Sequence, residues 1–241
     1  MTNNQNCAES QLAPSAIASI ERALRDIPHH DLADYLTAKD SHELSIAARS
    51  SLYFEGDEAD FYYEVISGCV CLYRMLADGR RLITRFVTTG GLFGITLTDN
   101  RYISADTVTA VVLRSHAMSS IQNAVHDHPE VARTLYLMAE LELDEAHEQS
   151  VMLGRKSARE KVAAFVWMLA EHCECRGGQD TAIELPMTRG DIADYLGLTT
   201  ETVSREMTYL RERGLITMQN SGMLRVQNMI GLIELAGSED M

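Results

Sequence analysis

The chain has 241 residues, of which 46% are hydrophobic and 23% charged, a composition typical of one large or two modest globular domains. Asp and Glu (35) outnumber Lys and Arg (21), and the net charge of −14 argues against general attraction to a polyanion such as DNA. With no apolar run of about 18 residues and no secretion signal, we expect a cytoplasmic protein without a membrane partner, its five cysteines reduced.

The sequence pattern of the N-terminal half predicts a β domain flanked by helices. Residues 1–16 are polar and predict a disordered tail, and apolar spacings of 3 and 4 predict a short helix within 17–38, broken near Pro28. Strand-like segments within 52–86 alternate with turn signals, including the hairpin turn Asp78-Gly79, and a further strand is predicted over 105–114. We bound this domain, with its flanking helices, at 17–128.

Residues 129–156 predict one long helix that starts at Pro129. A stripe along it has spacings of 4, 3, 4 and 3, which is a heptad pattern. The stripe either packs inside the chain or forms a seam with a second copy, and its two acids favour the seam. Acids that face each other across a two-fold axis would weaken the dimer, and Glu148→Ala would strengthen it. The seam residues are Leu137, Leu141, Asp144, Glu148 and Val151.

The C-terminal region, 157–241, starts with a predicted helix over 157–175 and contains a helix-turn-helix between Met187 and Gly214. Thr188 and Asp191 come close to a capping box, Gly197 supplies the turn, and Thr199 caps the second helix. Strands predicted over 215–219 and 223–227 flank Asn220-Ser221-Gly222, so the module is winged.

The second helix of this motif carries residues suited to reading bases. Glu201, Ser204 and Arg205 lie on one face of its first turns, the part that enters the major groove. Arg can donate twice to guanine, and Glu can accept from cytosine. An ordinary surface ion pair between Glu201 and Arg205 is the alternative. The candidate phosphate contacts are Arg189, Thr199, Thr200, Arg211 and Arg213.

These features together resemble the Crp/Fnr family of bacterial transcription regulators over nearly the whole chain. The segments that carry the resemblance are 54–68, the hairpin 73–81, the turn 90–94, 157–165 and the Glu-x-x-Ser-Arg pattern of Glu201, Ser204 and Arg205, which is closest to the Fnr/FixK branch. It implies an α+β fold with an N-terminal cyclic-nucleotide-binding-like β-roll, a long dimerisation helix at 129–156 and a C-terminal winged helix-turn-helix.

The resemblance also implies a function. The expected regulator binds a TTGAT-N4-ATCAA-like palindrome as a homodimer and controls gene expression under oxygen limitation. Its β-roll hairpin resembles a patch that touches RNA polymerase, and the candidates are Asp78, Gly79, Arg80 and Arg81. An ordinary exposed hairpin is the equal alternative. No enzyme motif is present, so we expect no catalytic residues.

Departures from the family concern its cofactors. An iron–sulfur cluster usually needs four thiolates, and the N-terminal region has only Cys7. Gly90-Gly91-Leu92 lacks the Glu of cyclic-AMP-binding members, and Arg101 is not followed directly by Ser. We therefore expect no metal, cluster or cyclic nucleotide. A member that senses through haem, or through thiols such as Cys69 with Cys71 or Cys173 with Cys175, stays open as the alternative.

The acidic balance is uneven along the chain. Residues 1–154 carry a net charge of −11 and residues 155–241 only −3. Net charge acts on nonspecific binding rather than on a site. We therefore expect weak binding to random DNA, with base contacts and the second subunit supplying affinity.

Overall fold

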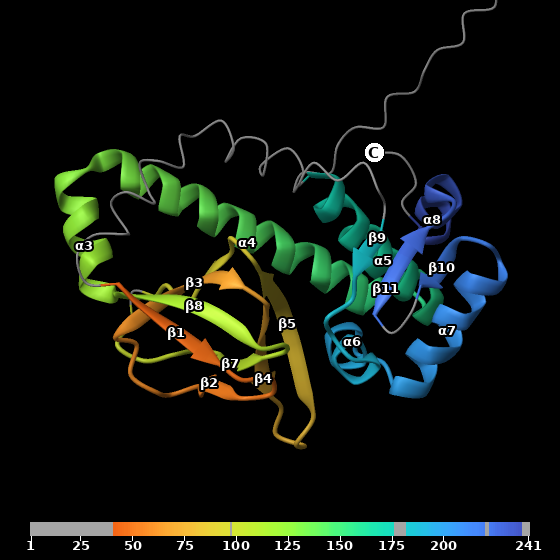
Figure 1. Ribbon diagram of the computed structural model, residues 1–241, viewed down its shortest axis with the longest axis horizontal. Helices are drawn as coiled ribbons and strands as arrows, with labels where there is room; N and C mark the ends of the chain where they lie inside the picture. Colours follow the sequence, from red (N-terminus) through yellow and green to blue (C-terminus); the bar gives the residue numbers. More distant parts are fainter. Residues whose placement is uncertain (1–40, 97, 176–181, 220–221, 238–241) are drawn as a thin grey trace, which may run out of the picture.

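The computed structural model describes residues 41–237 except 97, 176–181 and 220–221. The predicted tail 1–16, the helix within 17–38 and Cys7 lie outside the described residues. Figure 1 shows a β domain and a mainly helical C-terminal domain side by side, with one long helix running across the β domain to the C-terminal domain. Within the described residues no helix is long and apolar enough to cross a bilayer.

Two four-stranded antiparallel sheets form the β-roll, with strand orders β1-β8-β3-β6 and β2-β7-β4-β5. Val65, Val70, Val87 and Leu113 belong to the core between them, which explains the alternation of apolar residues along these strands. The strands are β1 (His42–Ile46), β2 (Ser51–Tyr53), β3 (Phe61–Ser67), β4 (Cys69–Met75), β5 (Arg81–Thr88), β6 (Leu92–Phe93), β7 (Ser104–Thr107) and β8 (Val111–Ala117).

The single strand predicted over 105–114 is wrong, because the chain changes sheets there. β7 pairs with β2 and β4, whereas β8 pairs with β1 and β3. The connection between them packs on Gly68, where φ is +95° and an added Cβ would lie 2.4 Å from the Ala110 carbonyl oxygen. Only glycine allows this approach.

Two helices lead from the roll to the C-terminal domain. These are α3 (Met118–Asp127) and α4 (Pro129–Arg155), and Pro129 occupies the first turn of α4 as predicted. α4 is fixed to the roll by Arg85 of β5, whose guanidinium lies 2.6 Å from Glu142 and 3.0 Å from Glu145.

The C-terminal domain is a winged helix-turn-helix. Its wing is a three-stranded sheet of order β10-β11-β9, so the predicted hairpin is confirmed and β9 adds a strand that we did not predict. The terminal helix α8 was also not predicted. The elements are α5 (Ala158–Cys175), β9 (Ala182–Glu184), α6 (Arg189–Leu196), α7 (Thr200–Glu212), β10 (Ile216–Gln219), β11 (Met223–Val226) and α8 (Met229–Leu235).

One apolar cluster extends from the outer side of the roll into this domain, separate from the core inside the roll. The Val70 face of β4 points into the roll, while Cys69, Cys71 and Tyr73 on its other face join the core of the C-terminal domain. Gln149 of α4, which is buried, donates from Nε2 to the carbonyls of Ile83 (2.9 Å) and Tyr195 (3.3 Å). β5, α4 and α6 therefore meet at one junction.

Candidate nucleic-acid interface

The turn between α6 and α7 is fixed by caps on both helices. The Thr188 hydroxyl accepts from the Asp191 N–H at 3.1 Å, and the Asp191 carboxylate accepts from the Thr188 N–H at 2.9 Å, which completes the predicted capping box. Gly197 ends α6 in the left-handed region at φ 62°. Thr199 then caps α7 by accepting from the Thr202 N–H.

α7 divides into an inner and an outer face. Val203, Met207 and Leu210 are buried against the rest of the domain. The predicted trio Glu201, Ser204 and Arg205 is exposed and lies together on the outer face. The side chains of the trio therefore project from the first turns of a capped helix, as the sequence predicted.

The two charged residues of the trio do not form the surface ion pair that was the alternative to base contacts. Arg205 is 68% exposed and donates from Nε to Glu206 at 3.1 Å, so its ion-pair partner among the described residues is its neighbour and not Glu201. The pKa of Glu201 is lowered by hydrogen bonds that its carboxylate accepts from the backbone N–H of Glu201 and from the side chain of Thr199. Glu201 is therefore an anion that can accept, and Arg205 keeps both terminal nitrogens for donation.

The candidate phosphate contacts divide into two groups. Thr199, Thr200, Arg211 and Arg213 are exposed around the ends of α7. Arg189 is half-buried at the start of α6, where its Nη2 lies 4.0 Å from the sulfur of Met218 and burial lowers its pKa. Arg189 is thus the least available of the five.

Three residues that we did not single out complete this surface. Arg159 of α5 stacks over the Tyr209 ring at 3.6 Å and forms a 3.0 Å ion pair with Glu206. Together with Arg205 they line an open depression of about 410 Å³ beside α7. Arg159 is 47 residues from Glu206 in the sequence, so no local spacing predicts the pair.

The residues of the seam predicted along α4 differ in their exposure. Leu141 is buried within its own chain, and Leu137 and Asp144 are half-buried, whereas Glu148 and Val151 are exposed. Leu141 cannot meet a second helix while it packs inside the subunit. A different stripe is exposed with spacings of 3, 4, 3 and 4, and we call it the outer stripe of α4: Tyr136, Ala139, Leu143, Ala146 and Ser150.

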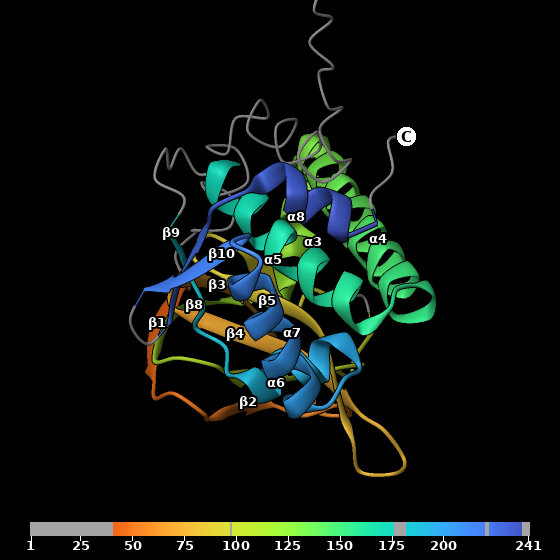
Figure 2. The ribbon, with the colours of Figure 1, turned by 90° about the vertical axis from the view of Figure 1, so that its right-hand side faces the viewer.

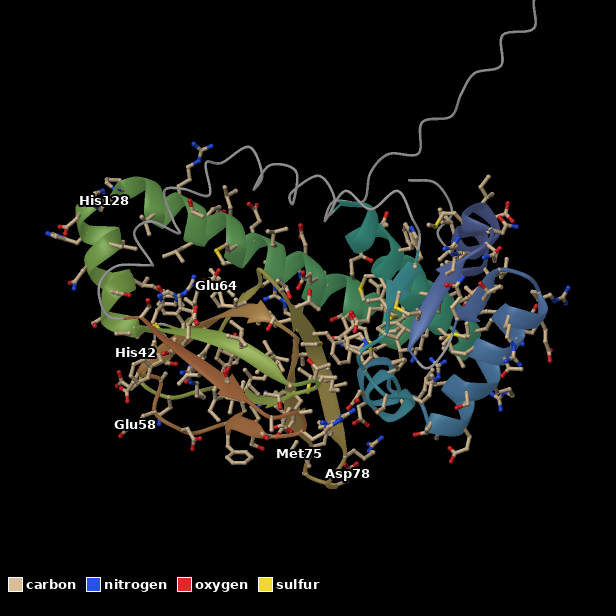
Figure 3. All side chains as sticks on the ribbon, in the orientation of Figure 1. His42, Glu58, Glu64, Met75, Asp78 and His128 are labelled. Atoms are coloured by element: carbon tan, nitrogen blue, oxygen red, sulfur yellow. The ribbon has the colours of Figure 1, made fainter. Side chains whose placement is uncertain are left out.

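The four candidate polymerase-contact residues of the β4–β5 hairpin lie in two different environments. Asp78, Gly79 and Arg80 lie exposed at the tip, and Figure 3 shows Met75 and Asp78 at the end that projects from the roll. Arg81 instead is the first residue of β5, paired with Met75, and bonds Asp191 (2.6 Å) and Asp194 (2.8 Å) of α6. Its charge is used between the two domains, so Arg81 is the least available of the four hairpin residues to a partner protein.

Comparisons with known proteins agree with this architecture. The model of the Crp-like helix-turn-helix domain matches residues 160–235, and that of the cyclic nucleotide-binding domain matches 43–127. The nitrogen fixation regulation protein FixK of Bradyrhizobium diazoefficiens is 34% identical over 222 residues, covering 91% of this chain and 90% of that protein. The chain belongs to the Crp/Fnr family of transcription regulators.

Further relatives place it among the FixK- and Fnr-type regulators. FixK of Rhizobium meliloti is 38% identical over 170 residues, covering 70% of this chain and 75% of that protein. The structure of FixK2 from Bradyrhizobium japonicum has a TM-score of 0.79 and 32% identity, and the match covers 83% of this chain and all of that one. This regulator therefore has the family's fold and its helix-turn-helix DNA-binding domain.

Among its described residues, the roll of this Crp/Fnr-type regulator holds one buried arginine, Arg101. The buried Arg101 guanidinium donates to the carbonyls of Gly94 and Phe61 and lies 4.3 Å from the Tyr53 ring centroid. Gly94 leaves it this space, since an added Cβ would lie 2.8 Å from Nη1. Arg101 is thus already held by protein carbonyls in this structure.

Thiol chemistry is disfavoured at the one cysteine pair whose side chains are described. Cys69 and Cys71 are free and buried, and burial raises the pKa of Cys69 to about 12 and that of Cys71 to about 11. Reactive thiols have lowered, not raised, pKa values. In the described part of the chain no three His, Cys, Asp or Glu side chains are grouped to hold a metal ion.

Proposed function

We propose that this regulator binds a TTGAT-N4-ATCAA-like palindrome, with Arg205 donating to the guanine of each half-site. Glu201 would accept from a cytosine amino group, and Ser204 would contact a neighbouring base. The observation that supports this is the exposure of Glu201, Ser204 and Arg205 together on the first turns of α7, where the Arg205 side chain is 68% exposed.

A palindrome requires two α7 helices related by a two-fold axis. We infer that the dimer forms through the outer stripe of α4, on which Tyr136 is 68% and Leu143 is 56% exposed. Large apolar side chains at heptad spacing on a helix with an unpaired face are typical of a coiled-coil seam. Glu148 is five residues from Leu143 and so lies about 140° around α4 from it, away from this stripe, and the predicted repulsion between acids across the seam would be weak.

The physiological signal is proposed from the relatives. Their names include FixK, the transcriptional activator FnrL of Cereibacter sphaeroides and an anaerobic regulatory protein of Pasteurella multocida. We infer that this chain likewise controls genes under oxygen limitation, in the cytoplasm. RNA polymerase would be contacted by the hairpin tip, where Asp78, Gly79 and Arg80 are exposed.

We further propose that no cyclic nucleotide, metal or cluster is needed for binding. The support is the commitment of Arg101 to carbonyls inside the roll and the burial of Cys69 and Cys71. Control would then act through the amount of protein and its dimerisation.

The test uses the full chain, without added effector, and a fluorescent duplex that carries the palindrome. We expect salt-dependent binding that is at least about 1,000-fold tighter than binding to a scrambled duplex of the same composition. Equal affinity for the two duplexes would contradict the proposal. A requirement for added cyclic AMP would contradict the absence of a nucleotide cofactor.

A further inference from the structure

Glu206 is an acid on the inner side of the helix proposed to read DNA. Its side chain is only 6% exposed, although it follows Arg205, which is 68% exposed. Inner positions of α7 are otherwise apolar, with Val203, Met207 and Leu210 all buried. A buried carboxylate at such a position is costly unless it is paired, so its partners show what it does.

Both oxygens of this carboxylate hold an arginine. Oε2 accepts from Nε of Arg159 at 3.0 Å, and Oε1 accepts from Nε of Arg205 at 3.1 Å. Burial raises the pKa of Glu206, but the hydrogen bonds and charges of the two arginines outweigh it, and the pKa lies below its ordinary value. Arg159 is in turn stacked on Tyr209 at 3.6 Å, so the acid is fixed from the α5 side.

The pair with Arg205 has a directional consequence. Glu206 takes the Nε–H, and no hydrogen bond to a described residue holds Nη1 or Nη2, so these two nitrogens stay available to donate end-on to guanine O6 and N7. An exposed arginine without such a partner samples many rotamers and loses that freedom on binding.

We propose that Glu206 is a positioning residue, which orients Arg205 for guanine and so sets sequence selectivity at that base. This rests on the proposed role of Arg205. The arrangement predicts two effects of opposite sign. The carboxylate improves selectivity by holding the fork, and it weakens attraction to any duplex because its negative charge lies beneath the DNA-facing surface.

The experiment measures two affinities for the full chain and its Glu206→Gln variant. The first result is the ratio between the affinity for the palindrome and the affinity for a palindrome in which adenine replaces the guanine of one half-site. The other is the affinity for a scrambled duplex. For the wild type we expect a ratio of about 5- to 150-fold. In Glu206→Gln the ratio should fall by about threefold or more, while affinity for the scrambled duplex rises about twofold.

The control is Glu212→Gln, which removes the same charge from the same helix at an exposed position without an ion pair to Arg205. It should raise affinity for the scrambled duplex and leave the ratio unchanged. The inference is overturned if Glu206→Gln keeps the wild-type ratio, or if it loses affinity for all duplexes by one common factor, as a purely structural residue would.

A second measurement needs no variant of Glu206. In the wild-type chain labelled with ¹⁵N-arginine, the Nε–H of Arg205, assigned through Arg205→Lys, should exchange with solvent more slowly than that of the exposed Arg211. Equal exchange of the two would also overturn the inference. The proposed function fails separately, through loss of the wild-type preference for the palindrome over the scrambled duplex.

Discussion

The guanidinium of Arg81, the first residue of β5, lies 2.6 Å from the carboxylate of Asp191 in α6. Asp191 also completes the capping box of the helix-turn-helix and accepts from Arg49 at 2.9 Å, while its side chain is only 2% exposed. One acid therefore holds the start of α6 and ties it to the roll. Figure 2 shows α6 and α7 facing the viewer, with the hairpin projecting beyond them.

Removal of this tie should weaken the folded state. Arg81→Ala leaves Asp191 buried with one fewer cation and removes the bond to Asp194, so we expect the free energy of unfolding in urea to fall by about 2 kcal/mol. Arg80→Ala is the matched control, because Arg80 is 77% exposed and pairs with Asp78 two residues away. If Arg80→Ala lowers the free energy of unfolding as much as Arg81→Ala does, the interdomain bond does not stabilise the fold more than an exposed ion pair.

The same tie predicts a dependence on pH. Burial raises the pKa of Asp191, but hydrogen bonds from Thr188, Arg49 and Arg81 outweigh it and leave the pKa lowered. Its stabilisation is therefore present above the unfolded-state pKa of about 3.9 and is lost as pH falls through the lower folded-state value. Urea unfolding of the wild type should weaken below about pH 4 more steeply than that of Asp191→Asn. Parallel curves for the two proteins would exclude Asp191 as a source of acid sensitivity.

Cys69 and Cys71 report on the contact between the domains. In a chain with Cys7, Cys173 and Cys175 replaced by Ser, we expect a thiol reagent at pH 7.5 to label both slowly, because they are buried and burial raises their pKa values to about 12 and about 11. Arg81→Ala should speed labelling of Cys71, which lies on the face of β4 beneath the C-terminal domain. Labelling of the parent chain at the rate of a free thiol would contradict this packing.

The fold followed closely from the sequence where local patterns decide it, as in the caps Thr188 and Thr199 and the turn at Gly197. Contacts between distant segments were not predictable. Arg81 has the sequence context of an exposed hairpin, yet its partners are 110 and 113 residues away. Glu206 similarly has no sequence signal for Arg159, and the Glu-x-x-Ser-Arg pattern does not include it.

The seam of α4 shows a second reason why the sequence did not predict every feature of the structure. The helix has two stripes at heptad spacing, and periodicity alone does not say which one packs against the roll. Leu141 and Leu143 are two residues apart and so point about 160° away from each other. Leu141 is 9% exposed and Leu143 is 56% exposed, which assigns the first to the core and the second to the outer stripe.

Substitutions at these two leucines should therefore have different effects, on dimerisation at Leu143 and on subunit stability at Leu141. Leu143→Glu puts a charge into the proposed seam, and sedimentation should show the dimerisation constant weakened by about 10-fold or more with the unfolding free energy per subunit little changed. Leu141→Ala should instead destabilise the subunit by about 2–4 kcal/mol. Glu148→Ala, at an exposed position away from the outer stripe, should change neither strongly. A dimer unaffected by Leu143→Glu would place the seam elsewhere.

The most direct test of the proposed function is a competition measurement with Arg205→Ala. Affinities of the full-length wild type and variant are compared on the palindrome and on one in which each half-site guanine is changed to adenine. We predict that Arg205→Ala loses about 1–3 kcal/mol per half-site on the palindrome and no longer distinguishes the two duplexes. If the variant binds the palindrome as tightly as the wild type and keeps its preference for guanine, Arg205 does not read that base.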